Sequence, residues 1–258
     1  MTFTGLIGRI CMFPLRAIIA TAVSLRIHPN VLTFVGVLIN VAAACALGLG
    51  RFVLAGVIMI VANIFDFIDG KVAVELDAVS AFGGFWDSVI DRFSDISLFI
   101  GLIFLYSQRE RTDYVMIAAL AMMFAIMTSY TRARAESLIP KCKVGFMERP
   151  ERIVLFMIGA FTDRMAGVLW VILVLSVVTV ANRIYYTYLE LERRPMPPAT
   201  GAAGLLWRFF FWRDDRATLP YDIWVIAILA FTWLTPPDWL ADPMAMGGRG
   251  MIQWLMGQ

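Results

Sequence analysis

The feature that most limits the fold of this chain is a series of long apolar runs, of which residues 30 to 49 are the clearest. This stretch of 20 residues carries no charged side chain, and about 20 apolar residues are what a helix needs to cross the hydrocarbon core of a bilayer. Hydrophobic residues make up 60% of the 258-residue chain and charged residues 16%, with a mean hydropathy of +0.76. Water-soluble domains do not have this composition. The sequence predicts an all-α integral membrane protein.

Five further apolar segments follow the first one. We predict transmembrane helices at 52–68, 83–107, 113–135, 152–162 with its flanks, and 166–188. With the first run they make a bundle of six transmembrane helices. The fifth segment is short, and only Thr162, Asp163 and Arg164 separate it from the sixth.

The two ends of the chain have a different pattern. Residues 1–28 alternate apolar clusters with arginines, which favours an amphipathic helix lying in the membrane interface. Beyond 190, a Pro/Gly-rich linker (194–204) and an aromatic-basic stretch (205–216) lead to an apolar run at 223–234. That run is shorter than an ordinary span, so it is either an interfacial helix or a seventh crossing. We therefore divide the chain into a membrane domain, 1–190, and a C-terminal extension, 191–258.

The distribution of Lys and Arg predicts the orientation in the membrane, because loops on the cytoplasmic side carry the excess of these residues. With the N-terminus inside, the outer loops hold only Arg51, Arg109, Arg111 and Arg164. The inner loops then hold the basic residues near the N-terminus, Lys71, the basic residues from 132 to 152 and the arginines of the extension. This orientation places the loop around residue 76 at the cytoplasmic face of an inner membrane.

Four aspartates near that loop form two pairs. Asp66 and Asp69 are three residues apart, and Asp87 and Asp91 are four apart, so on a helix both members of each pair lie on one face. A carboxylate at the centre of a spanning helix costs about 2.5 to 3.5 kcal/mol, so a partner is expected. Mg²⁺ or Mn²⁺ suits converging carboxylates; the alternative is that these residues face water at the span ends.

The spacing of these aspartates resembles the signature of the CDP-alcohol phosphotransferase family, D-x2-D-G-x2-A-R-x8-G-x3-D-x3-D. Seven of its eight fixed positions are present: Asp66, Asp69, Gly70, Ala73, Gly83, Asp87 and Asp91. The eighth position, an Arg in the family, is Val74 here. Lys71 lies one helical turn away and could compensate in part.

The resemblance implies transfer of a phosphatidyl group from CDP-diacylglycerol to an alcohol with release of CMP, at a site with two Mg²⁺ or Mn²⁺ ions in a homodimeric membrane protein. It implies four metal ligands: Asp66, Asp69, Asp87 and Asp91. Asp91 would also be the catalytic base that takes the proton of the acceptor hydroxyl. The CDP moiety would be bound by Asp69, Gly70, Ala73, Gly83, Asn30 and Thr33, the last two at the start of the first span.

A second group of residues follows the fourth span, in SYTRARAESLIPKCKVGFMERPER (129–152). Arginine is suited to bidentate binding of phosphate, although these charges could also reflect only the positive-inside rule. The segment resembles the acceptor-binding region of the phosphatidylinositol-phosphate synthase branch, in which Y-x-(K/R)-A-R-A-E precedes E-R-x-E-R. That resemblance implies that the acceptor phosphate, such as that of inositol phosphate, is bound by Arg132, Arg134, Arg149 and Arg152.

Several alternatives remain open at this level. The acceptor could be glycerol phosphate, as in a phosphatidylglycerophosphate synthase. The chain could also be a degenerate relative that binds CDP-lipid without turnover, for which Val74 is the argument. A cation transporter would need acidic groups along a path, whereas here they gather near one face. We expect no nucleic-acid partner.

Overall fold

The computed structural model of the chain describes residues 15–194 and 218–240, together with residues 201, 204, 207, 211, 212 and 242. Residues 1–14, and most of the linker and the aromatic-basic stretch expected at 194–216, lie outside the described residues. Within the described part, every regular element is helical, which agrees with the all-α fold expected from the sequence.

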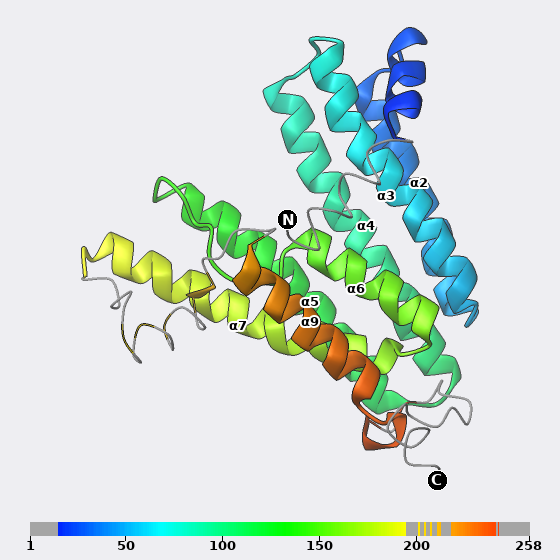
Figure 1. Cartoon of the computed structure of the whole chain (residues 1–258), viewed down its shortest axis with the longest axis vertical. Coiled ribbons are helices and arrows are strands. Elements are labelled where there is room, and N and C mark those ends of the chain that lie inside the picture. The colour runs from blue at the N-terminus through cyan, green and yellow to red at the C-terminus, as the bar shows by residue number, and fades with distance from the viewer. Residues whose placement is uncertain are drawn as a thin grey trace.

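The helices follow the apolar segments of the sequence closely (Figure 1). A helix at Leu15–Ser24 comes first. The elements after it are α2 (Pro29–Gly48), α3 (Phe52–Glu75), α4 (Ala81–Gln108), α5 (Thr112–Glu136), α6 (Arg149–Thr162), α7 (Met165–Leu191), α9 (Leu219–Leu234) and the short 3₁₀ helix η1 (Pro237–Leu240).

Local signals explain where the key helices begin and end. Ser80 caps α4, because its Oγ accepts a hydrogen bond of 3.0 Å from the backbone N–H of Gly83, and serine at this position satisfies a donor that the helix leaves unpaired. Pro150 stands in the first turn of α6, where its missing N–H is of no consequence. At its other end α6 stops at Asp163, which adopts a left-handed conformation with φ of 55°.

Four helices, α2, α3, α5 and α7, are long and apolar enough to cross a membrane. Large apolar side chains on their outer faces are exposed, for example Leu38, Val53 and Val174, as expected for surfaces in contact with lipid. Helix α4 has 28 residues but carries charged side chains in its first half, and α6 has 14 residues, which corresponds to roughly 21 Å of helix. The fold is that of a multi-helix membrane protein.

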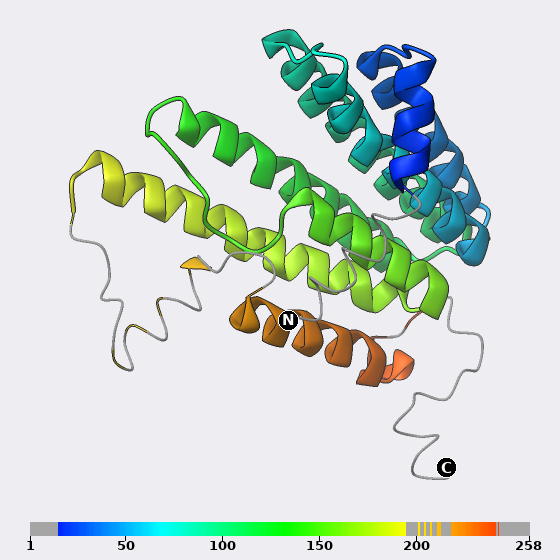
Figure 2. The ribbon, with the colours of Figure 1, turned by 45° about the horizontal axis from the view of Figure 1, so that its top comes forward.

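The helices form two groups that meet along the bundle. Helices α2, α3 and α4 contact one another, as do α5, α6 and α7 through α7, and the contacts of α4 with α5 and of α3 with α6 join the groups. Figure 2 shows α9 lying alongside α7. The C-terminal end of α3, the N-terminal ends of α4 and α6 and the C-terminal end of α5 all lie at one end of the bundle, where the candidate site forms.

Small residues allow this close packing. The main buried cluster contains many alanines among larger side chains, and small residues let helix backbones approach in membrane proteins. The closest approach is that of α4 to α2, because a Cβ placed on Gly101 would lie 2.3 Å from the carbonyl oxygen of Ala44. A second, smaller cluster joins Ile19 and Ala22 of the N-terminal helix to α2 and α3.

Candidate active site

Three aspartates converge at the end of the bundle. Asp66 and Asp69 come from α3 and Asp87 from α4, and one carboxylate oxygen of each lies within 4.8 Å of the others. The connection between the helices, residues 76–80, is short enough to bring the two halves of the motif together. Helix α3 ends at Glu75 rather than at the expected residue 68, so the first pair lies inside a continuous helix.

The three carboxylates satisfy the requirements of a divalent cation site. They offer oxygen donors, which Mg²⁺ and Mn²⁺ prefer, and carboxylates this close repel one another unless a cation lies among them. Metal–oxygen bonds of about 2.0 to 2.6 Å place ligand oxygens up to about 4 to 5 Å apart, which is the scale of this triad. The residues present therefore fit the divalent metal that the sequence predicts.

Helix α2 orients one of these carboxylates. The hydroxyl of Thr33 donates a hydrogen bond of 2.5 Å to Oδ2 of Asp69, and both side chains are buried. Thr33 is placed for this contact by the start of α2, which His28 caps by accepting a 3.2 Å hydrogen bond from the N–H of Asn30. Hydrogen bonds of this kind fix the orientation of a metal-binding carboxylate.

Asp91 lies beside the triad and is held by arginines. Its Oδ1 is 3.0 Å from Nη1 of Arg149, and its Oδ2 is 3.5 Å from Nη2 of Arg92. The same Nη1 of Arg149 donates a hydrogen bond of 2.6 Å to Oδ2 of Asp66. Arg149 therefore bridges the first aspartate of the motif and the last, although it is distant from both in the sequence.

The next carboxylate along α4, Asp95, belongs to a buried ion pair. Its Oδ2 accepts a hydrogen bond from Nη2 of Arg152, whose side chain is 1% exposed. Arg152 also donates to the Thr128 hydroxyl at 3.1 Å, and Asp95 is 3.6 Å from Nε of Arg149. The sequence left open what Asp95 contacts; the structure makes it the partner of Arg152 and a neighbour of Arg149.

A cavity of about 340 Å³ opens beside Asp91, a size within the usual range of small-molecule sites. Its lining is rich in arginine and contains two carboxylates. The lining residues are Ser88, Arg92, Thr128, Ser129, Arg132, Ala133, Glu136, Glu148, Arg149, Pro150 and Arg183. Its wall is thus built from α4, α5, α6 and α7.

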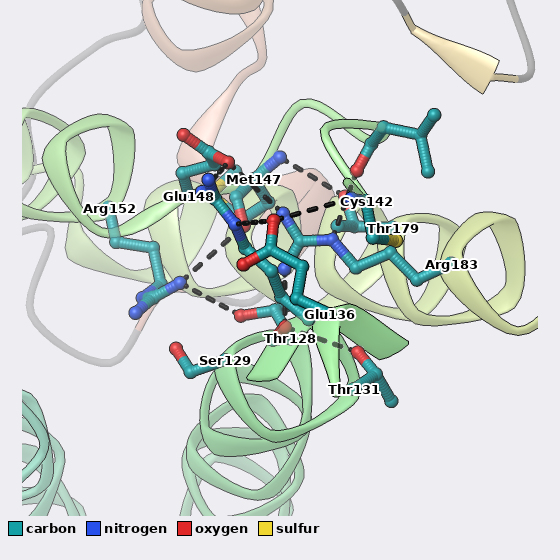
Figure 3. Close-up of polar contacts among 12 residues, drawn as sticks. Thr128, Ser129, Thr131, Glu136, Cys142, Met147, Glu148, Arg152, Thr179 and Arg183 are labelled. Atoms are coloured by element: carbon teal, nitrogen blue, oxygen red, sulfur yellow. Dashed lines mark hydrogen bonds and ion pairs between the residues drawn. The ribbon is translucent and has the colours of Figure 1, made fainter. Parts of the chain in front are cut away.

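Glu148 organises the arginines on the far wall of the cavity (Figure 3). Its Oε1 accepts hydrogen bonds from Nη1 of Arg132 at 2.9 Å and from Nη2 of Arg183 at 3.1 Å. Arg183 also donates through Nε to the carbonyl of Val144 at 3.0 Å and through Nη1 to the carbonyl of Thr128. This network ties α5 and α7 to the segment that leads into α6.

The four arginines predicted to bind an acceptor occupy different positions. Arg132 and Arg149 line the cavity. Arg134 is exposed and donates to the Ser137 hydroxyl at 3.2 Å, and Arg152 is buried against Asp95; neither is a lining residue.

Two arginines that sequence reasoning missed, Arg92 and Arg183, complete the basic wall. Arg92 directly follows Asp91, and Arg183 stands alone among charged residues in the middle of the apolar run of α7. A charge within a membrane helix is itself a signal of a functional or packed position. This signal could have drawn attention to Arg183 from the sequence.

The residues predicted to bind CDP lie on the other side of the triad. Gly70 is exposed, and a Cβ built on it would meet nothing within 4 Å, whereas a Cβ on Gly83 would lie 3.7 Å from Oδ1 of Asn30. Gly83 is therefore brought next to α2, while Ala73 is half-buried on α3. These small residues leave the backbone near Asp69 accessible to a ligand.

Val74, which replaces the family's arginine, is 67% exposed on α3. Lys71, its possible substitute, is also exposed, and its Nζ lies 5.9 Å from the centre of the Phe67 ring. Space for a longer side chain is thus available at position 74.

Comparison with known proteins agrees with this arrangement. The sequence model of the CDP-alcohol phosphatidyltransferase family matches residues 26–182. The archaetidylinositol phosphate synthase of Pyrococcus horikoshii is 36% identical over 180 residues, which are 69% of this chain and 93% of that protein.

Solved structures give the same relationship. The phosphatidylinositol phosphate synthase of Mycobacterium tuberculosis with CDP-DAG bound superimposes with a TM-score of 0.63 and 25% identity, over 67% of this chain and 93% of that one. The same enzyme in complex with manganese and citrate gives a TM-score of 0.64 and 26% identity, over 73% and 96% of the two chains.

Proposed function

This chain belongs to the CDP-alcohol phosphatidyltransferase family, and from that premise we propose that it transfers a phosphatidyl group from CDP-diacylglycerol to a phosphorylated polyol, inositol phosphate, with release of CMP. One observation carries the proposal. Arg149 contacts Asp66 of the carboxylate triad and Asp91, and it also lines the basic cavity. A donor held at the triad and a phosphorylated acceptor held in the cavity would therefore meet at Asp91.

The donor binds on the triad side. Asp66, Asp69 and Asp87 would hold divalent cations, whose contribution is to neutralise the negative charge of the diphosphate and of the leaving CMP. Mg²⁺ and Mn²⁺ both suit these oxygen donors. Asn30, Thr33, Gly70, Ala73 and Gly83 would surround the CDP moiety, since Gly83 lies close to Asn30 and Thr33 bonds to Asp69.

The acceptor binds in the cavity. Arg92, Arg132, Arg149 and Arg183 form a cationic wall, and guanidinium groups form charge-assisted bidentate hydrogen bonds with phosphate. The two carboxylates that also line the cavity, Glu136 and Glu148, would accept hydrogen bonds from polyol hydroxyls. A phosphorylated polyol matches both kinds of group.

Asp91 is the residue best placed to act as the base. It lies between the triad and the cavity, with Arg149 and Arg92 beside it. An acceptor hydroxyl in the cavity would lose its proton to the Asp91 carboxylate as its oxygen attacks the phosphatidyl phosphorus. The bond from that phosphorus to the CMP oxygen would break, and CMP would leave with the electron pair.

We extend the proposal to the placement in the membrane. Helices α2 to α7 would make six crossings, with the N-terminal helix at the interface and the site facing the cytoplasm. The excess of Lys and Arg near the site end supports this orientation. The protein would act in the inner membrane as a homodimer, which chemical cross-linking would test.

The decisive experiment measures CMP release from CDP-diacylglycerol by the purified full-length protein, in Mg²⁺ or Mn²⁺, with inositol phosphate, glycerol phosphate or unphosphorylated inositol. We expect metal-dependent release with inositol phosphate that is lost in Asp91→Asn. Release with glycerol phosphate alone would reassign the acceptor. No release with any acceptor, despite measurable CDP-diacylglycerol binding, would refute the proposal and favour a degenerate relative.

A further inference from the structure

Residues beyond the family match, which ends at 182, contact the segment that leads into the active-site arginines. The backbone N–H of Gly145 donates a hydrogen bond of 3.0 Å to the carbonyl of Phe211. The Phe146 ring packs edge-on against Trp212, with centroids 4.6 Å apart, and also meets Tyr221 at 5.7 Å. Phe146 and Trp212 are both buried. The segment at 144–148 therefore has its outer side covered by the C-terminal extension.

A polar contact continues this covering into α6. The Tyr221 hydroxyl, in the first turn of α9, donates a hydrogen bond of 2.9 Å to Oε1 of Glu151. Glu151 is buried and lies in the first turn of α6 between Arg149 and Arg152. A buried carboxylate that loses a donor is strongly destabilised, so this contact helps to fix the N-terminal turn of α6.

The other end of α9 is also fastened to the bundle. Nη1 of Arg164, in the α6–α7 connection, donates a 3.0 Å hydrogen bond to the carbonyl of Thr235, and the Tyr114 hydroxyl donates to the carbonyl of Leu240. Helix α9 thus extends along the bundle from one end of α6 to the other, as the ribbon shows (Figure 2).

The inner side of the same segment rests on α7. Gly145 has a φ of +91°, and a Cβ at this position would lie 2.4 Å from Cγ2 of Thr179. The N–H of Met147 donates to the Thr179 hydroxyl at 3.1 Å. Residues 144–148 are therefore held between α7 and the extension, and the next side chains along the chain are Glu148, which pairs with Arg132 and Arg183, and Arg149.

From these contacts we infer that the C-terminal extension positions the acceptor-binding wall: Trp212 and Tyr221 hold residues 144–151 so that Glu148 and Arg149 face the cavity. Neither residue lines the cavity, so both act through the segment that they hold. This inference rests on the proposed function, because it takes the cavity to be the acceptor site.

The test uses the full-length protein with Tyr221→Phe, Trp212→Ala, and Trp212→Phe as a conservative replacement. Tyr188→Phe is the matched control, since this exposed tyrosine of α7 stacks only on other aromatic rings. We expect Tyr221→Phe to raise the KM for inositol phosphate about fivefold, the effect of one hydrogen bond, and Trp212→Ala to raise it further. The kcat and the KM for CDP-diacylglycerol stay unchanged, and Trp212→Phe recovers most of the loss.

Hydrogen–deuterium exchange over residues 143–148 gives a second readout that needs no activity. Faster exchange in Tyr221→Phe and Trp212→Ala, but not in the control, is expected. Unchanged exchange together with an unchanged acceptor KM would overturn the inference, even if the melting temperature fell. Wild-type protein that releases no CMP would refute the proposed function instead, and the exchange data would still decide whether the extension orders the segment.

Discussion

Replacing Thr33 with valine removes one hydroxyl and preserves shape, so it isolates the hydrogen bond that orients Asp69. The lost contact is the 2.5 Å bond from Thr33 Oγ1 to Asp69 Oδ2, made between two buried side chains. Hydrogen bonds to charged groups contribute about 1.5 to 3 kcal/mol. A loss of that size corresponds to a metal affinity about 10- to 100-fold weaker, the range usual for residues that orient a metal ligand.

The assay is the Mn²⁺ dependence of CMP release, together with Mn²⁺ binding by isothermal titration calorimetry. The matched control is Thr162→Val, because the Thr162 hydroxyl bonds only to the carbonyl of Ile158 in its own helix at 2.7 Å, at the other end of α6. We expect Thr33→Val to need more Mn²⁺ for half-maximal rate, with little change in the melting temperature. Equal Mn²⁺ affinity in wild type and both variants would refute the role of Asp69 as an oriented ligand.

Three further predictions concern packing, charge and the altered motif. Gly101→Val should lower the stability of the bundle by about 1 to 3 kcal/mol through overpacking, since its Cβ would collide with the carbonyl of Ala44; thermal unfolding in detergent measures this. Arg152→Ala should destabilise the protein by about 3 to 5 kcal/mol because Asp95 is left buried without its partner, and a melting temperature equal to that of wild type would contradict the pair's importance. Val74→Arg should raise turnover or lower the KM for CDP-diacylglycerol without loss of stability, because position 74 is exposed; kinetics that do not improve would mean that the family's arginine is not needed here.

The sequence by itself determined the helices and the two halves of the aspartate motif. Length and apolar character limit a membrane-spanning segment to a helix, because its backbone groups must be satisfied internally, so the helix bounds could be read from residues 30 to 188. The i+3 and i+4 spacings fix a common face regardless of neighbours. The proximity of Asp66, Asp69 and Asp87 then followed from a connection too short to separate α3 from α4.

Only the tertiary structure decided which arginines share the cavity with Asp91. Arg149 and Arg152 lie one turn apart on α6, yet one lines the cavity and the other is buried on Asp95. Their fates differ because the packing of α6 against its neighbours sets which partner each side chain meets, and sequence spacing carries no information about that. The same holds for Arg183 and for Tyr221, whose contacts with the segment at 144–151 join parts of the chain that no local pattern connects.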